Sequence, residues 1–187
     1  MRVPLLILCL VFICATQADA EARNWAEAFG GYSLLSGDLF HRGSGWEFSL
    51  TKNLMVDRGM PWLGIQGDFG AHHQSNGLAQ RNEHSFLFGP QFEHSFERMT
   101  ITGRVLAGLS HTSGLPQQNN SFSYSVGGAA DWNLTDFLAL RVAQFDYQPI
   151  RLQGNYQHNA RISAGIVFRI AAYYDRAPRH SAKPTFK

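Results

Sequence analysis

The chain has 187 residues, two cysteines and a formal net charge of +2. This length fits one domain, and the basic excess is too small to argue for a nucleic-acid partner. Both cysteines, Cys9 and Cys14, lie in an N-terminal segment that we expect to be removed. The mature protein would then have no disulfide, no thiol nucleophile and no thiolate metal site.

Residues 1–20 have the features of a secretory signal peptide. Arg2 provides the positive start, residues 5–15 form the apolar stretch, and Ala18-Asp19-Ala20 fits the A-x-A pattern of a cleavage site. The apolar stretch is shorter than the roughly 20 residues that a membrane-spanning helix needs. We therefore expect export, followed by cleavage after Ala20.

Beyond this segment, apolar and polar residues alternate with a period of two, which predicts β-strands. The clearest case is 45–51, where Trp46, Phe48 and Leu50 share one face. In chain order, the predicted strands are 26–35, 45–51, 62–71, 84–95, 100–110, 121–134, 137–147 and 159–170. Eight such strands predict an all-β fold, an antiparallel up-and-down barrel within residues 21–170.

Two strands carry local irregularities. Pro90 has no backbone N–H for the ladder, so it predicts a bulge or a locally broken pairing. In 137–147 the alternation changes phase near Ala143-Gln144. We interpret this slip as a β-bulge that turns Gln144 and Asp146 toward the barrel interior.

The polar face of the strands distinguishes a membrane barrel from a soluble one. It is rich in Gly and Ser and carries charges of both signs without lysine, namely Glu27, Glu47, Asp68, Glu93, Arg104, Asp131, Arg141, Arg161 and Arg169. A water-facing surface would usually include lysine, whereas planar guanidinium groups suit pairing with carboxylates in a packed lumen. Aromatic residues near both strand ends also fit the girdles of outer-membrane barrels. We therefore predict an eight-stranded transmembrane β-barrel.

This interpretation implies a location and partners. We expect a monomer in the cell outer membrane, in contact with membrane lipid and lipopolysaccharide. Inside the lumen, Glu27, Glu93 and Asp131 would pair with Arg104, Arg141 and Arg169 near the periplasmic end. Higher up, Glu47 and Asp68 would pair with Arg161, because unpaired buried charges are costly.

The connections suggest an orientation, because outer-membrane barrels have short periplasmic turns and longer outer loops. We assign 52–61, 96–99 and 135–136 to periplasmic turns, although the first is long for a turn. The outer loops would be 36–44, 72–83, 111–120 and 148–158. Residues 171–187 contain two prolines and several basic residues, and they predict a disordered periplasmic tail.

Short motifs resemble the OmpA-like family of outer-membrane β-barrels. They are Phe29-Gly30-Gly31-Tyr32-Ser33, the stretch from Leu140-Arg141-Val142 to Asp146-Tyr147, and 163–170. The last is similar to the C-terminal β-signal of such proteins, with Ser163, Gly165, Phe168 and Ile170 at its polar, glycine and two hydrophobic positions. The resemblance covers about 25–170 and implies recognition by the barrel assembly machinery. A departure is that the signal does not end the chain.

A side-chain-filled lumen favours a structural or interaction role through the surface loops, with no catalytic, cofactor or metal site. A narrow pore is one alternative. Another is a lipid A deacylase, since such barrels use His-x-Ser with a glutamate downstream. His-x-Ser occurs as His73-Gln74-Ser75, with Glu83 downstream, and as His111-Thr112-Ser113, which no acid follows at a suitable distance. His72, His73 and His84 would be the ligands if an outer loop held a metal ion.

Overall fold

The computed structural model describes residues 23–38, 42–55, 60–75, 80–96, 98–114, 119–152 and 155–172. The predicted signal peptide and residues 173–187 of the predicted tail lie outside these ranges. Across the residues described, no helix has the length and apolar character needed to cross a membrane.

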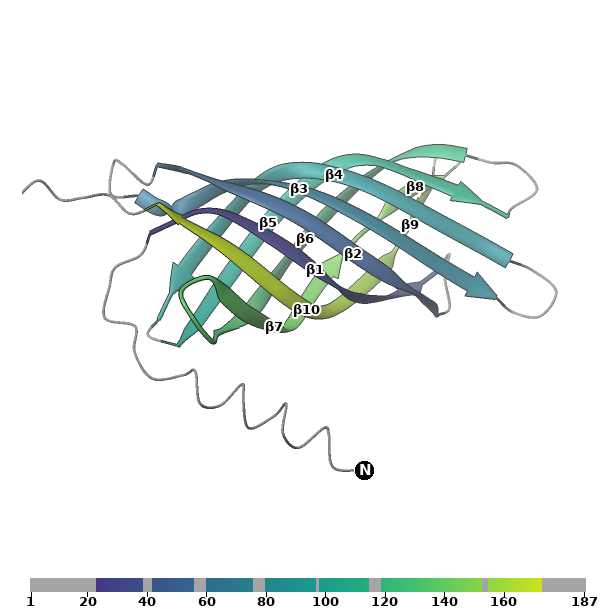
Figure 1. The fold of residues 1–187 in the computed structure, drawn as a ribbon. Coiled ribbons are helices and arrows are strands. Elements are labelled where there is room, and N and C mark those ends of the chain that lie inside the picture. Colours follow the sequence, from purple (N-terminus) through teal and green to yellow (C-terminus); the bar gives the residue numbers. More distant parts are fainter. Residues whose placement is uncertain are drawn as a thin grey trace, which may run out of the picture.

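Eight antiparallel strands close into a barrel (Figure 1). They are β1 (Arg23–Gly37), β2 (Gly43–Met55), β3 (Met60–Ser75), β4 (Gln80–Ser95), β5 (Met99–Ser113), β6 (Asn119–Asn133), β7 (Leu138–Tyr147) and β10 (Asn159–Ala172). The first seven pair in sequence order, and β10 closes the barrel by pairing with β7 and β1. The predicted eight-stranded antiparallel barrel is therefore confirmed.

A small hairpin occupies the connection between β7 and β10, at the opposite end of the barrel from the start of β1 (Figure 1). It consists of β8 (Ile150–Leu152) and β9 (Asn155–Gln157). β8 pairs with β6 through Ile150 and Ser123, and the Ile150 side chain is fully buried. This connection therefore folds back against the mouth of the barrel. We call this end, where β1, β3 and β5 end and β2, β4 and β6 begin, the loop end.

Strand pairing sets the stagger of the barrel. One row of paired residues leaves β2 at Gly43 and returns to β2 at Asn53, a shift of 53 − 43 = 10 residues. In order, this row contains Gly43, Leu35, Arg161, Asp146, Gly127, Arg104, Gln91, Gly64 and Asn53. In a barrel of eight strands, the interior is just wide enough for side chains to fill.

All barrel strands except β7 are longer than predicted, so most connections are shorter. The predicted loops 36–44, 72–83 and 111–120 reduce to 38–42, 76–79 and 114–118, and the predicted turn 52–61 reduces to 56–59. Ladder hydrogen bonds continue past the last apolar side chain, because they need only the backbone. About 9–11 residues of a tilted strand cross the hydrocarbon layer, whereas β3 and β4 have 16 each. The predicted contrast between short turns and long loops is therefore wrong, except for 148–158.

Both predicted irregularities are present. On β7, Arg141 pairs with Asp131 and Ala143 with Ala130, so Val142 is the extra residue of a bulge. Gln144 and Asp146 consequently turn inward and are buried. At Pro90, the β4–β5 ladder stops after Phe88 and resumes at Gln91 without a change of register.

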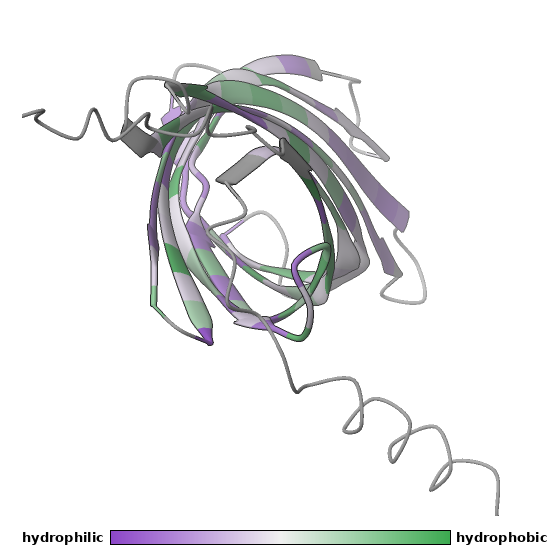
Figure 2. Ribbon diagram, turned by 60° about the vertical axis from the view of Figure 1, so that its left-hand side comes forward, coloured by the Kyte–Doolittle hydropathy of each residue, from purple (hydrophilic) through white to green (hydrophobic). Residues whose placement is uncertain are grey.

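The distribution of apolar and polar side chains between the outside and the interior of the barrel is the reverse of that in a soluble protein. Large apolar side chains cover the outside, with Phe86 61% and Leu109 63% exposed, while most of the buried side chains are polar or charged. Figure 2 shows the matching alternation of hydropathy along the strands. A few apolar residues also fill the lumen, namely Phe29, Leu35, Leu87, Leu106 and Val167. Such an exterior is suited to hydrocarbon.

Candidate functional site: the luminal charge network

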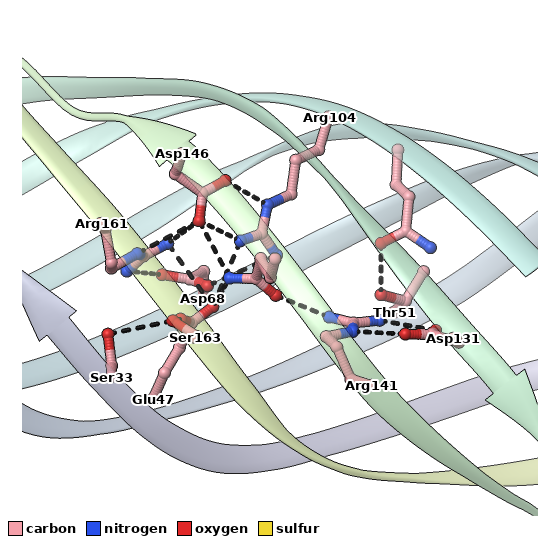
Figure 3. A network of polar contacts seen from close by, with 12 residues as sticks. Ser33, Glu47, Thr51, Asp68, Arg104, Asp131, Arg141, Asp146, Arg161 and Ser163 are labelled. Carbon is pink, nitrogen blue, oxygen red and sulfur yellow. Dashed lines mark hydrogen bonds and ion pairs between the residues drawn. The ribbon is translucent and has the colours of Figure 1, made fainter.

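Three carboxylates and two guanidinium groups meet within the lumen (Figure 3). They form the central cluster, composed of Glu47 on β2, Asp68 on β3, Arg104 on β5, Asp146 on β7 and Arg161 on β10. All five side chains are buried. Arginine suits this position, because its planar group binds several carboxylate oxygens at once.

Asp146 bridges the two arginines of the central cluster. Arg104 donates to its carboxylate from Nε at 2.9 Å and from Nη2 at 2.5 Å. Arg161 donates to Asp146 Oδ2 from Nε and Nη2, both at 3.2 Å, and to Asp68 Oδ1 from Nη1 at 2.9 Å. Glu47 Oε1 lies 3.3 Å from Arg104 Nη2 and 3.5 Å from Arg161 Nη2. Each buried charge therefore faces opposite charges from more than one strand.

Gly127 makes room for this cluster. It lies between Asp146 and Arg104 in the row of paired residues, so a side chain there would separate the two. A Cβ built on Gly127 would overlap Asp146 Oδ1 and the Phe145 carbonyl oxygen. The absence of a side chain at this position thus allows Arg104 to reach Asp146 across β6.

We expect Gly127→Ala to lower the free energy of unfolding by about 1–3 kcal/mol, the usual cost of overpacking. The matched control is Gly103→Ala, because a Cβ on Gly103 meets nothing within 4 Å. Urea unfolding of the protein in lipid vesicles would measure both. Equal stability of the two variants would contradict the spatial role assigned to Gly127.

A second cluster lies toward the start of β1. Arg141 donates to Asp131 from Nε at 2.7 Å and from Nη2 at 3.0 Å, and its guanidinium carbon lies 4.4 Å from the centre of the Phe29 ring. Arg169 donates from Nε to Glu27 at 2.8 Å, and its Nη2 lies 3.6 Å from Asp131. These contacts connect β1, β6, β7 and β10.

Gln144 joins the two clusters. Its Nε2 donates to Glu47 at 2.5 Å and to Asp146 at 2.9 Å, and its Oε1 accepts from Arg141 Nη1 at 2.8 Å. The bulge on β7 turns this side chain inward. The polar network is therefore continuous from one cluster to the other.

A third group extends the network toward the loop end. His72 Nδ1 lies 2.9 Å from Glu83 Oε2, and His72 Nε2 lies 2.9 Å from Ser33 Oγ. Gln148 donates from Nε2 to Glu83 at 3.2 Å. Ser163 connects this group to the central cluster, because its hydroxyl lies 3.0 Å from Ser33 Oγ and 2.6 Å from Glu47 Oε2.

The Ser163 hydroxyl is the donor in both of its contacts. The Glu47 carboxylate can only accept, so Ser163 donates to Glu47, and Ser33 Oγ also accepts from the same hydroxyl. The direction of the bond between Ser33 and His72 depends on which ring nitrogen of His72 carries the proton.

The same three residues bear on catalysis. The distances among Ser33, His72 and Glu83 match those of a Ser-His-acid triad, in which histidine accepts the serine proton. Here all three side chains are buried, and Ser33 also accepts from Ser163. The arrangement therefore forms part of the packed lumen, in which the Ser33 hydroxyl has no access to solvent.

The structure places eight of the nine predicted charges within the two clusters, and one of the eight changes group. Arg104, expected near the periplasmic end, joins the central cluster with Glu47, Asp68 and Asp146. The other seven lie as grouped in the prediction. Glu93 was expected to pair with an arginine, but it is only partly buried, accepts from the Ser95 hydroxyl at 3.5 Å and has no ion pair among the described residues. The stagger of the barrel places Arg104 nearer the loop end than Arg141.

Sequence reasoning left three residues out of the predicted charge network. The phase slip in β7 predicted that Asp146 turns inward, but Asp146 was given no partner. Glu83 shares the inward parity of Ser85, but it was assigned to a loop because the predicted strand began at His84. His72 was likewise assigned to a loop, and it faces Glu83 across the β3–β4 pair.

The structure separates residues that the deacylase hypothesis and the metal hypothesis each need together. His73 points outward and its Nδ1 bonds Asn82 Oδ1, whereas Glu83 points into the lumen. His72 and His73 lie on opposite faces, because they are adjacent on one strand. Within the described part of the chain, no group of three or more His, Cys, Asp or Glu residues could hold a metal ion.

The residues of the β-signal motif lie on β10. Ser163 points inward and bonds Glu47, and Gly165 packs against the backbone of Gly30 and Gly31. Phe168 and Ile170 point outward and are exposed. The polar and glycine positions thus serve packing, and the two hydrophobic positions are left accessible.

No family model and no curated protein matches this chain. Solved structures of other proteins share its fold. Neisserial surface protein A (NspA) matches with a TM-score of 0.57 at 12% identity, over 78% of this chain and 96% of NspA. The outer membrane protein OprG from Pseudomonas aeruginosa matches with a TM-score of 0.50 at 8% identity, over 83% of this chain and all of OprG (100%). The chain therefore has the fold of small eight-stranded outer-membrane barrels, and the predicted OmpA-like barrel is confirmed at the level of the fold.

Proposed function

We propose that this protein is exported and resides in the outer membrane as a monomeric barrel with a closed lumen, in a structural or interaction role through the connections at its loop end. The observation that carries this proposal is the belt of exposed apolar side chains around a core of paired charges. A soluble protein rarely exposes so continuous an apolar surface, whereas a membrane barrel requires one.

The contacts across the lumen support a closed barrel over a narrow pore. The polar network runs without interruption from Gln148 at the loop end to Arg141 near the other end. Phe29, Ala139 and Val167 add an apolar group beside Arg141. Opening a path would leave buried charges without their partners, which is costly.

Planar-bilayer recordings test this closure. We expect no discrete conductance steps from the refolded wild-type protein, after folding is verified by heat-modifiable gel mobility. Stable steps in proportion to the amount of folded barrel would contradict a closed lumen and support the pore.

The orientation is tested by epitope insertion. An epitope placed at Gln117, between β5 and β6, should be reached by antibody on intact cells, because the loop end would face outward. An epitope added after Lys187 should require permeabilised cells. Labelling of the C-terminal epitope in a strain with a verified intact envelope would overturn this topology.

The proposed contact with the barrel assembly machinery rests on the accessibility of Phe168, which is 55% exposed and lies on β10 within the motif. We expect Phe168→Ala to reduce accumulation in the outer membrane several-fold while leaving refolding in detergent nearly unchanged. An exposed ring contributes little packing inside the barrel.

Ile162→Ala is the matched control for Phe168→Ala. Ile162 lies on the same strand and face with similar exposure, 54%, but precedes the motif. Immunoblots of membrane fractions would compare the two variants with the wild type. Equal accumulation of both variants would argue against a special role of Phe168 in assembly.

A further inference from the structure

The outward face of the barrel strands, as far as the structure describes it, is free of carboxylates. Among the residues of the eight barrel strands whose side chains the structure describes, no Asp or Glu alternates onto this face. The side chains there that can carry positive charge are Lys52, His73, His84, His94 and His111. This face therefore accommodates an anionic neighbour without repulsion.

Three of these histidines gather in one place. His73 on β3, His84 on β4 and His111 on β5 lie on adjacent strands near the loop end. His84 and His111 are direct partners across β4 and β5, and His73 pairs with Asn82, two residues before His84. We call these residues, together with Asn82 and Asn120, the imidazole patch.

The same contact occurs twice within the imidazole patch. His73 Nδ1 lies 2.5 Å from Asn82 Oδ1, and His111 Nδ1 lies 2.6 Å from Asn120 Oδ1. An amide oxygen accepts, so in both residues Nδ1 carries the proton that is donated. The second proton that makes the ring cationic must then go to Nε2. Each such histidine has one ring nitrogen fixed and the other available for a ligand.

The patch lies where the apolar wall ends. Phe86 lies two residues from His84, and Leu109 two residues from His111, in each case farther from the loop end. Both side chains are highly exposed and belong to the apolar belt. His84 also stacks on Phe69, with 6.5 Å between the ring centres. Imidazoles directly above such a belt occupy the level of lipid headgroups.

The groups around the patch favour an anion with oxygen acceptors. On the neighbouring strands, Ser44 faces His73 from β2 and Asn120 faces His111 from β6. The nearby carboxylate of Glu83 points into the lumen, where it bonds His72. Arg81 also belongs to the inward-facing set of β4, and Arg42 precedes β2 with an exposed side chain. Cationic N–H groups without an adjacent carboxylate suit phosphate.

We propose that the imidazole patch binds the phosphate groups of the phosphorylated glycolipid that borders the loop end, and that this binding strengthens as the pH falls. The proposal rests on the outer-membrane location and orientation proposed above, which the epitope experiment tests separately. Imidazole is the side chain whose charge changes between about pH 5 and pH 8. Protonation of His73, His84 and His111 adds positive charge and N–H donors at the headgroup.

The experiment titrates refolded protein, in a neutral detergent, with bisphosphorylated lipid A at about pH 5.5 and about pH 8. Lipid retained on the barrel is counted by native mass spectrometry. A basic residue near an anionic membrane surface contributes about 1 kcal/mol, which corresponds to about a fivefold change in affinity. We expect at least that gain at the lower pH, and its loss in the triple variant His73→Gln, His84→Gln, His111→Gln.

His94→Gln is the matched control variant. His94 is also exposed and outward-facing, and it contacts an aromatic ring, Phe96, at 4.8 Å between ring centres, but it lies at the other end of β4. It should bind lipid A as the wild type does. If the triple variant does not fold, the single variants of His73 and His111 replace it, each with about a fivefold loss expected.

Two further binding measurements identify the ligand. Dephosphorylated lipid A should bind without pH dependence, and inorganic phosphate at the same concentration should not displace the lipid. Equal binding of the triple variant and the wild type, unchanged binding across the pH range, or equal binding of dephosphorylated lipid would each overturn the proposal. Displacement by inorganic phosphate would also overturn it in favour of a free-anion site.

Discussion

Arg161→Met should lower the free energy of unfolding by about 3–5 kcal/mol, the cost of breaking a buried ion pair from one side. Arg161 is fully buried and contacts Asp68, Asp146 and Glu47. After its removal, Arg104 would be the remaining cation of the central cluster for three carboxylates. Asp68 would be left with Arg104 Nη1 at 3.9 Å as its ion-pair contact in the cluster. Urea unfolding in lipid vesicles, followed by tryptophan fluorescence, would measure the loss.

Two variants separate this electrostatic effect from lost packing. Arg161→Met combined with Asp68→Asn removes one charge of each sign and should recover part of the stability, because the unpaired carboxylate is gone. Arg151→Met changes an exposed arginine on β8 and should alter stability by less than about 0.5 kcal/mol. If Arg161→Met were as mild as Arg151→Met, the central cluster would not support the barrel.

Val105→Arg should destabilise the barrel by about 2–4 kcal/mol in a bilayer, the range for arginine on the lipid face at the midplane. Val105 lies near the middle of β5, points outward, is 48% exposed and pairs with Val126 on β6. A guanidinium group placed there would lose its hydration. The cost should be much smaller in detergent micelles, where water lies closer. Comparing unfolding in the two environments would assign the effect to the bilayer.

Leu109→Arg provides the depth control for Val105→Arg. Leu109 is on the same strand and face, four residues nearer the loop end. It lies two residues before His111 of the imidazole patch. Arginine close to the interface should cost about 0–1 kcal/mol, because its side chain reaches water. Equal costs at the two positions would mean that β5 does not cross the bilayer as inferred.

The charge network and the lipid-facing belt depend on each other. The apolar exterior places the barrel in hydrocarbon, where the lumen is the main space left for polar side chains between the two interfaces. Inside it, the pairs from Arg104, Arg161 and Arg169 connect strands that are far apart in sequence. Losing one arginine therefore weakens contacts on several strands together, whereas a change on the lipid face acts through its depth alone.

The sequence by itself determined the strands and their two faces. Successive side chains of a strand point to opposite sides, so Trp46 and Glu47 are separated by local geometry alone. The phase slip at Ala143 was likewise enough to predict that Gln144 and Asp146 turn inward. The lack of lysine among the inward charges pointed to a lumen, because lysine is common on a water-facing surface.

The tertiary structure decided where the strands end and which charges meet. Ladder pairing carries β3 and β4 past their last apolar residues, and this places His72 opposite Glu83 inside the barrel. The partner of an inward charge depends on a stagger that accumulates from strand to strand and reaches ten residues around the barrel. Alternation indicates the face on which a residue lies but not its position along the barrel axis. The stagger sets that position, and for this reason Arg104 meets Asp146 and not Asp131.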